Sequence, residues 1–167
     1  LLSPQEIDRL AEGCGEKLCP QFHLSLQSGC DATLARMNRH YNTAQYRAVA
    51  AAVREAFPGA ALTTDMMVGF AGETPEDHRK SLDFAREIGF AKIHAFSYSQ
   101  RPGTRAAAMP HQVPPAEQKR RRAELITVAA ELRAAALSSM LGTRQPVLFE
   151  QRGQQGFTGY TPNYTPV

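Results

Sequence analysis

The sequence has no tryptophan and only three cysteines among its 167 residues. Cys14, Cys19 and Cys30 have the spacing C-x4-C-x10-C, which contains no close C-x2-C pair. An odd number of cysteines at irregular spacing argues against a disulfide framework and favours a reducing cytosol, and it is a poor zinc pattern. We therefore expect three free, buried or half-buried thiols, no metal ligands and a cytoplasmic protein.

Long uncharged runs are also missing. The stretches 60–64 and 66–72 are far too short to cross a bilayer, and residues 1–15 lack the apolar core of a signal peptide. Hydrophobic residues make up 43% of the chain, enough for a packed core, and the length is that of one ordinary domain. The net charge of +3 permits contact with nucleic acid without indicating it.

The sequence alternates between strand and helix signals. Apolar or alternating runs predict strands at 23–26, 61–70 and 92–99, and caps with apolar stripes predict helices at 3–13, from Asp31, at 43–57, 74–89 and 116–141. Residues 20–141 thus repeat strand, loop and helix three times. This pattern is typical of an α/β fold with a parallel sheet, open or curled into a barrel. Residues 146–164 read instead as the start of a small all-β module.

In a parallel sheet, ligands bind at the carboxyl ends of the strands. Three predicted loops meet there. The candidate residues are Gln27, Ser28 and Gly29 after the first strand, Asp65, Gly69, Gly72 and Glu73 at the second, and Phe96, Tyr98, Ser99 and Arg101 at the third. Glycines let the backbone approach a ligand, carboxylates hold hydroxyls or amines, and aromatic edges cover a base. These residue types suit a polar, aromatic small molecule such as a nucleoside.

Several of these residues also have a purely structural interpretation. Asp65, inside an apolar strand, is either structural or functional, because a buried carboxylate needs partners. Gly69–Gly72 can be a tight turn, and Glu73 can favour a helix N-terminus. We expect His23 and His94 to be core histidines. The run 120–122 of three arginines is either a solvated helix face or an RNA contact.

Four strings in register carry a resemblance to a known family. They are HLSLQSG (23–29), RMNRHY (36–41), TDMMVGFAGET (64–74) and FSYSQRPGT (96–104). Together they resemble the radical S-adenosylmethionine methylthiotransferases. The segment from Val147 to Tyr164 resembles the opening of that family's TRAM domain, a small RNA-binding β-barrel. The resemblance implies the C-terminal half of a (β/α) radical SAM barrel, with three parallel βα units in residues 1–142, and the first strands of a β-barrel in 143–167.

Within the family, Ser25, the pair Cys30-Asp31, Ile93-His94 and the segment GYTPNY (159–164) resemble most the branch that modifies threonylcarbamoyladenosine next to the tRNA anticodon. The branches for isopentenyladenosine in tRNA and for a ribosomal protein are close alternatives. The family's reaction implies S-adenosylmethionine and two 4Fe–4S clusters. One cluster cleaves the cofactor to a 5′-deoxyadenosyl radical, and the other delivers the sulfur that becomes a methylthio group.

The resemblance also implies roles for individual residues. It assigns Gln27, Ser28, Asp65, Gly69, Gly72, Glu73, Phe96 and Tyr98 to the cofactor wall, and Arg39 and Arg101 to substrate binding, with the tRNA anticodon stem-loop as partner. The family's C-x3-C-x2-C loop is missing, so neither cluster ligands nor catalytic residues are expected in these residues. We expect an inactive piece of a longer enzyme that self-associates through uncovered sheet edges. The alternative is a non-catalytic RNA-binding module, which the coding sequence upstream of Leu1 would distinguish.

Overall fold

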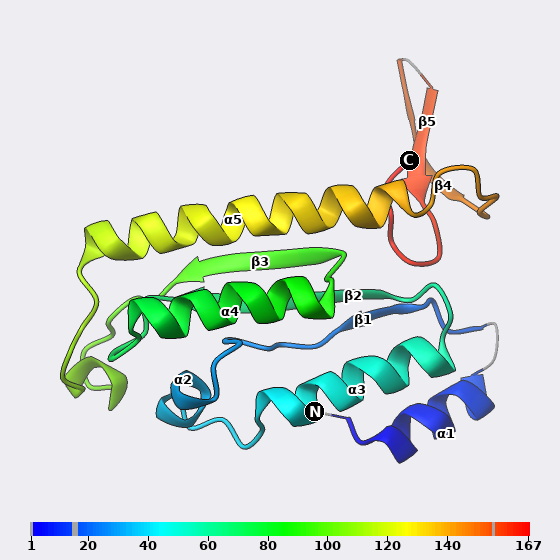
Figure 1. Ribbon diagram of the computed structural model, residues 1–167. Helices are drawn as coiled ribbons and strands as arrows, with labels where there is room; N and C mark the ends of the chain where they lie inside the picture. The colour runs from blue at the N-terminus through cyan, green and yellow to red at the C-terminus, as the bar shows by residue number, and fades with distance from the viewer. Residues whose placement is uncertain (1, 15–16, 155) are drawn as a thin grey trace.

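The structure, a computed structural model, describes residues 2–14, 17–154 and 156–167. Its centre is a parallel sheet in the order β1-β2-β3, formed by β1 (Gln21–His23), β2 (Ala61–Val68) and β3 (Lys92–Ser97). The register places His23 beside Thr63 and places Asp65 beside His94. The expected α/β fold with parallel strands is therefore confirmed (Figure 1).

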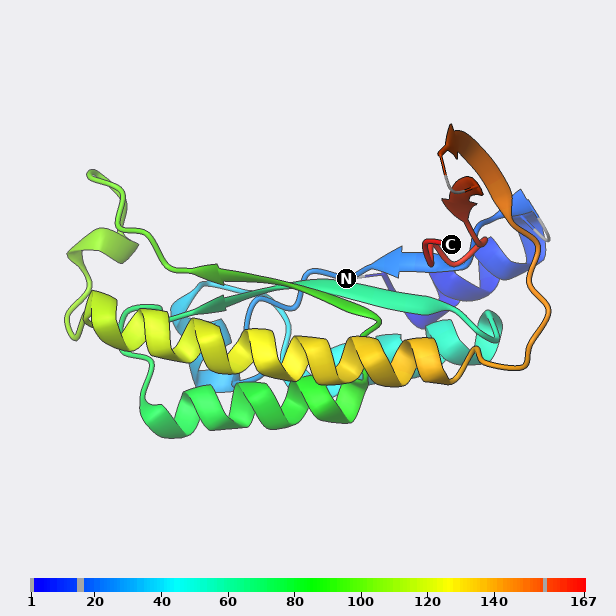
Figure 2. The ribbon, with the colours of Figure 1, turned by 90° about the horizontal axis from the view of Figure 1, so that it is seen from above.

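Helices connect the strands and cover one face of the sheet. They are α1 (Pro4–Cys14), α2 (Asp31–Arg36), α3 (Thr43–Ala56), α4 (Pro75–Ile88) and α5 (Pro115–Ser138), with a short 3-10 helix at Ala106–Ala108. Figure 2 shows α4 and α5 side by side along the sheet. The predicted start of α4 is confirmed, because Thr74 and Asp77 form a reciprocal capping box, and Gly89 ends the helix in the left-handed conformation.

The predicted cap of α2 is wrong. Cys30 occupies the cap position, and the carboxylate of Asp31 instead accepts the backbone N–H of Thr43 at 2.7 Å. Asp31 therefore ties the start of α2 to the start of α3. The predicted start of α3 at Thr43 is correct, and Asn42 caps the helix together with Gln45.

The core lies between the sheet and the helices. Successive side chains point to opposite faces of the sheet, and Phe22, Leu62, Met66 and Ile93 point into the core. The helices meet them with a common set of buried side chains: Tyr46, Val49 and Val53 of α3, Phe84 and Ile88 of α4, and Leu125 and Val128 of α5. The alternate strand residues face the other side of the sheet.

The first strand ends earlier than the predicted 23–26 because a side chain replaces a backbone partner. The Thr64 hydroxyl accepts the N–H of Leu26 at 2.9 Å and donates to the carbonyl of Leu24 at 2.7 Å. Backbone pairing with β2 resumes at Gln27, whose N–H donates to Asp65 and whose carbonyl accepts from Met67, both at 2.8 Å. The predicted extent of β1, 23–26, is therefore wrong: the strand is Gln21–His23, although the chain stays alongside β2 as far as Gln27.

The C-terminal segment forms an antiparallel hairpin of β4 (Leu148–Gly153) and β5 (Gly156–Tyr160) beyond the end of α5 (Figure 1). Leu148, Phe149 and Phe157 are exposed on it. Weak polar contacts join it to the helical layer, since the side chains of Asn163 and Thr165 reach the Met140 sulfur at 3.8 and 3.4 Å. The expected change to a small β unit after residue 142 agrees with this arrangement.

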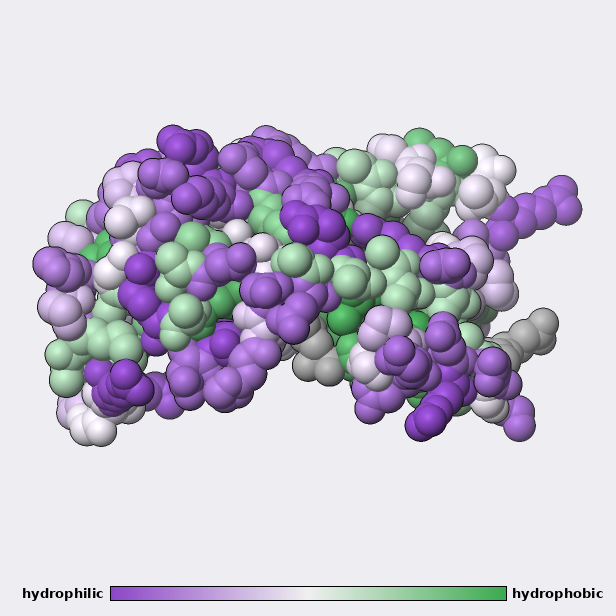
Figure 3. Space-filling model, turned by 60° about the horizontal axis from the view of Figure 1, so that its bottom comes forward, coloured by the Kyte–Doolittle hydropathy of each residue, from purple (hydrophilic) through white to green (hydrophobic). Residues whose placement is uncertain are grey.

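The molecular surface mixes hydrophilic and hydrophobic side chains on the face seen in Figure 3. Among the described residues, no helix is both long enough and apolar enough to cross a membrane.

Candidate functional site

A polar strip runs across the face of the sheet opposite the helices. Thr63 accepts a hydrogen bond from the Gln21 amide at 3.0 Å and lies 3.1 Å from Nδ1 of His23. His23 Nε2 lies 3.3 Å from Oδ2 of Asp65, and the Ser25 hydroxyl donates to that same oxygen at 3.4 Å. The strip therefore ends in a half-buried carboxylate that two side chains orient and that still reaches solvent.

The prediction that His23 and His94 are core histidines is wrong. The His23 side chain is 40% exposed, and its ring centroid lies 6.1 Å from that of His94, which is only half-buried. Both belong to the strand positions that alternate with the core residues, so they face the same side as Asp65. The polar strip was not predicted, but the alternation of Gln21, His23 and Ser25 with Phe22, Leu24 and Leu26 in the sequence is a signal for it.

The loop after β1 packs onto α4 and is only partly available to a ligand. Gln27 has a positive φ of 68° and pairs through its backbone with β2. Ser28 is buried, and its hydroxyl lies 3.0 Å from that of Ser81. A Cβ at Gly29 would lie 2.7 Å from Cβ of Phe84, so the loop approaches α4 as closely as a glycine allows. The Ser28 hydroxyl therefore serves the packing of this loop.

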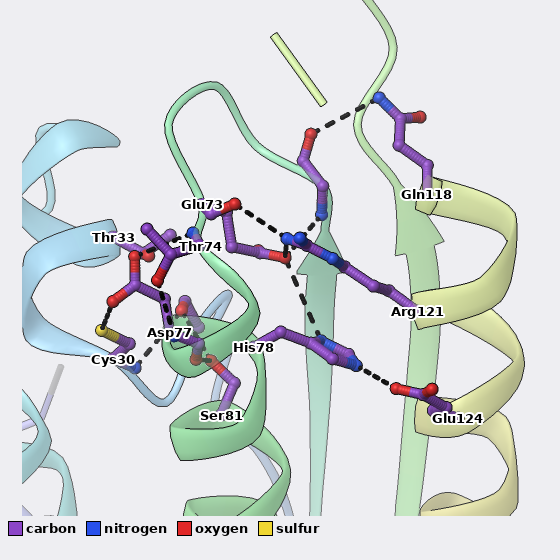
Figure 4. A network of polar contacts seen from close by, with 12 residues as sticks. Cys30, Thr33, Glu73, Thr74, Asp77, His78, Ser81, Gln118, Arg121 and Glu124 are labelled. Atoms are coloured by element: carbon purple, nitrogen blue, oxygen red, sulfur yellow. Dashed lines mark hydrogen bonds and ion pairs between the residues drawn. The ribbon is translucent and has the colours of Figure 1, made fainter. Parts of the chain in front are cut away.

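The turn after β2 is fixed by a buried ion pair. Glu73 and Arg121 are both almost wholly buried, and Nη1 of Arg121 donates to Oε1 of Glu73 at 2.6 Å and to its carbonyl at 2.9 Å (Figure 4). The same Oε1 accepts the backbone N–H of Gly69 at 3.1 Å. The Glu73 carboxylate thus points toward α5 rather than toward the open face of the sheet.

A second buried network joins α2 to α4 beside that turn. Arg36 donates to Oδ2 of Asp77 at 2.8 Å, and the Cys30 thiol donates to Oδ1 at 3.2 Å. Burial by itself raises the pKa of Asp77, but the bonds from the backbone of Thr74, from Arg36 and from Cys30 together hold that pKa below its usual value. Asp77 therefore stays charged and links the two helices.

Aromatic residues line the end of β3. Phe96 is 51% exposed and lies on the same face as His94, beside Met67 in the register. Tyr98 is buried against Phe70 with ring centroids 5.1 Å apart, and its hydroxyl has no hydrogen-bond partner among the described residues. Phe96 is thus available to a ligand, whereas Tyr98 supports the wall behind it.

The two predicted substrate residues lie in exposed loops. Arg101 follows β3, and Arg39 lies between α2 and α3. The arginine run on α5 is mostly engaged within the molecule. Arg120 pairs with Glu117 and Glu124, Arg121 pairs with Glu73 and Glu117, and Arg122 donates to the carbonyl of Ala95 at 3.2 Å. The RNA-contact interpretation of this run is therefore weakened for Arg120 and Arg121.

The thiols do not form a cluster site. Cys30 is buried, Cys14 is half-buried and Cys19 is exposed, so the expectation that all three are at least half-buried is wrong for Cys19. Iron–sulfur clusters are held mainly by several Cys thiolates, and in the ranges 2–14, 17–154 and 156–167 no group of three or more Cys, His, Asp or Glu side chains is arranged to hold a metal ion. These residues therefore do not fit an iron–sulfur cluster.

Solved structures support this fold. The chain is similar to coproporphyrinogen III oxidase from Escherichia coli, described as a radical SAM enzyme, with a TM-score of 0.63 and 19% sequence identity. The similarity covers 94% of this chain and 38% of that protein. At this identity the likeness concerns the fold, and it agrees with the expected part of a radical SAM barrel.

Three curated relatives carry the same name, tRNA-2-methylthio-N(6)-dimethylallyladenosine synthase. The identities are 41% for the protein of Corynebacterium urealyticum, 43% for that of Maricaulis maris and 37% for that of Chloroflexus aurantiacus, over 88%, 84% and 93% of this chain. The alignments cover 27%, 31% and 34% of the relatives, so the chain spans about a third of their length or less.

A family model also matches the first half of the chain. The model is that of the radical SAM superfamily, and it matches residues 1–85, which include α1 to α3, β1, β2 and the Gly69–Glu73 turn. The match covers just over half of the 167 residues and agrees with the parallel βα architecture. The chain therefore belongs to the radical SAM superfamily.

Proposed function

We propose that this chain forms part of a tRNA methylthiotransferase that acts on N6-dimethylallyladenosine. The observation that carries the proposal is that the relatives, 37–43% identical over most of the chain, share that name. They favour the isopentenyladenosine alternative over the threonylcarbamoyladenosine branch, which none of these three names mentions. The substrate would be the modified adenosine in the anticodon stem-loop, and the enzyme would work in the cytoplasm.

Within that enzyme, residues 1–142 would supply one wall of the catalytic barrel and residues 143–167 would begin a TRAM-like module. Asp65 is the best-placed group for an S-adenosylmethionine hydroxyl or amine, because its carboxylate faces the open side of the sheet and is oriented by His23 and Ser25. Phe96 would cover an adenine ring, and Gln27 would offer polar contacts at the same edge. S-adenosylmethionine, when bound in the whole enzyme, would supply the radical and the methyl group.

We infer indirect roles for the other candidate residues. Ser28, Gly69, Gly72, Glu73 and Tyr98 would shape the wall without touching the cofactor through their side chains, because they pack against α4, α5, Phe70 and, for Gly72, the Arg36 side chain of α2. Arg39 and Arg101 are exposed and remain the residues that we assign to tRNA. The two 4Fe–4S clusters would be held by other parts of the enzyme, so these residues alone would be inactive.

The sheet edges support the expected self-association of an isolated piece. Neither the outer edge of β1 nor that of β3 pairs with another strand in the described ranges. Unpaired edges are templates for pairing with another chain. Sedimentation of the isolated 167-residue chain would show dimers or larger species, and a monomer at all concentrations would contradict this.

The function is tested with the intact gene product that contains this chain. It would be produced in a bacterial strain that makes both N6-dimethylallyladenosine and N6-threonylcarbamoyladenosine in tRNA but methylthiolates neither. Mass spectrometry of digested tRNA should then detect only the 2-methylthio derivative of dimethylallyladenosine. Methylthiolation of threonylcarbamoyladenosine would restore the first branch, and binding of tRNA without any new nucleoside would favour the non-catalytic module.

A further inference from the structure

We propose that Arg121 is a positioning residue for the site at the carboxyl edge of the sheet, because it fixes the Gly69–Glu73 turn through Glu73. The proposal rests on the proposed function insofar as it takes S-adenosylmethionine to bind at that edge. Arg121 comes from α5, which follows β3 and lies far along the chain from the turn. The sequence placed Arg121 only in the arginine run 120–122, as a solvated residue or an RNA contact, and not beside the cofactor residues.

The pair is almost completely removed from solvent. The side chains of Arg121 and Glu73 are 4% and 2% exposed. A buried ion pair contributes little net stability over well-packed apolar residues, because desolvation offsets the attraction. The planar guanidinium of Arg121, however, donates hydrogen bonds in fixed directions. In this case one Nη1 atom holds both the carboxylate and the carbonyl of Glu73, and Nε is held by Glu117 at 2.8 Å. The arrangement therefore favours a positional role over a stabilising one.

Several side chains hydrogen-bond to the Gly69–Glu73 turn, and Arg121 holds Glu73, which in turn holds Gly69. Glu73 accepts the N–H of Gly69, while the Gln118 side chain, also from α5, lies 3.4 Å from the Gly69 carbonyl. A Cβ at Gly69 would lie 2.4 Å from Gln118, so no other residue type fits without movement. Since both polar backbone groups of Gly69 are held by side chains, removing Arg121 would leave the Glu73 carboxylate that holds one of them with only His78 Nδ1, 4.0 Å away, beside it among the described side chains.

Other contacts keep α4 and α5 together when Arg121 is replaced. Nε2 of His78 on α4 lies 2.9 Å from Oε2 of Glu124 on α5. Leu125 and Val128 remain buried in the main core. The substitution Arg121→Met keeps an unbranched side chain in the same space, so the apolar contacts of the helix layer should remain. The buried Glu73 carboxylate then lacks its counterion, and the cost of that uncompensated charge should fall on the turn that contains it.

The test compares R121M with R122M in the intact protein, because both remove one positive charge from α5 and only Arg121 is buried against the turn. Hydrogen exchange should accelerate about tenfold at the amides of residues 69–73 in R121M while residues 61–66 of β2 exchange as before. Equilibrium binding of S-adenosylmethionine should weaken about tenfold in R121M and stay within twofold in R122M. R121K should fall in between, because a lysine cannot hold Glu117 and both oxygens of Glu73 together.

Unchanged binding of S-adenosylmethionine by R121M would overturn the proposal, as would an acceleration of exchange that spreads equally over β2. If R121M does not fold, R121K gives the same comparison, and a binding constant equal to that of the wild type would again overturn it. Hydrogen exchange and equilibrium binding of S-adenosylmethionine can both be measured without catalytic turnover. An intact protein that binds S-adenosylmethionine but makes no methylthio nucleoside would refute the proposed function and leave the role of Arg121 separately tested.

Discussion

Oδ2 of Asp65 lies 3.3 Å from Nε2 of His23, across adjacent strands and on the side of the sheet opposite the helices. The two side chains are 32% and 40% exposed, so the pair stands at the boundary between the sheet and solvent. A carboxylate that is held by a neighbour on one oxygen is pre-oriented for a ligand on the other. This pair is therefore the part of the polar strip most suited to recognise a hydroxyl or an amine.

Replacing Asp65 by asparagine in the intact protein should weaken S-adenosylmethionine binding about tenfold, because the charge-assisted hydrogen bond becomes a neutral one. Equilibrium dialysis would measure the change. Asp83→Asn is the matched control, since Asp83 lies on the outer side of α4 with Arg86 3.5 Å away. Equal losses in the two variants would argue against a role of Asp65 in binding.

Replacing Gly29 by alanine should destabilise the chain by about 1–3 kcal/mol, because the new methyl group overpacks the contact between the β1 loop and α4. The added Cβ would lie 2.7 Å from Cβ of Phe84 and 2.8 Å from Cα of Ser81. Urea unfolding would measure the loss. Gly13→Ala in α1 has no atom within 4 Å of the new Cβ and should instead be neutral or stabilising.

The first turns of α5 should lose stability in acid, because Glu117 pairs there with Arg120 and Arg121 of the same helix. Arg120 and then Arg121 hold the pKa of Glu117 at about 2, below the ordinary value of 4.5. A carboxyl group with a lowered pKa stabilises the folded state above pH 4.5 and loses that contribution as the pH falls toward 2. Glu117→Gln should therefore reduce the free energy of unfolding at neutral pH, and its difference from the wild type should shrink through that window.

Urea titrations at several pH values would follow this difference. Glu150→Gln, on the exposed hairpin strand β4, makes the same change of charge away from α5 and serves as the control. A difference between wild type and E117Q that stays constant down to pH 2 would show that the Glu117 pairs do not contribute.

Replacing Gly159 by alanine should open the hairpin and leave the parallel sheet intact. Its Cβ would lie 1.9 Å from the carbonyl oxygen of Leu148 on the paired strand, which backbone atoms cannot accommodate without shifting. Hydrogen exchange should accelerate at residues 148–160 and stay unchanged at 61–68. Gly153→Ala, whose nearest contact would be 3.6 Å away, should leave the hairpin formed.

The sequence allowed prediction of the order of elements because local signals agreed with the final packing. The capping residues of α4, the left-handed Gly89 and the apolar stripe of α3 are all readable within one or two turns. The end of β1 was not predictable in this way. It depends on the Thr64 hydroxyl, which lies on another strand and takes the place of a backbone partner for Leu24 and Leu26.

The sequence predicted where in the fold the candidate site lies, but not which of its side chains face the open side of the sheet. The rule that ligands bind at the carboxyl ends of parallel strands identified Asp65 and Phe96, which do lie on the open face. It could not separate them from Ser28 and Glu73, whose side chains turn toward α4 and α5. Arg121 was missed because its significance arises only when α5 crosses the turn after β2.

The arginine run of α5 changes how the net charge of +3 is interpreted. Arg120 and Arg121 face carboxylates of their own chain, and within the described residues only Arg122 of the three has no such counterion. A polyanion that approached this helix would therefore displace few small counterions there, and the salt dependence of its binding would be shallow. Steeper dependence on ionic strength would have to originate at other cationic side chains, such as Arg39 and Arg101 in their exposed loops.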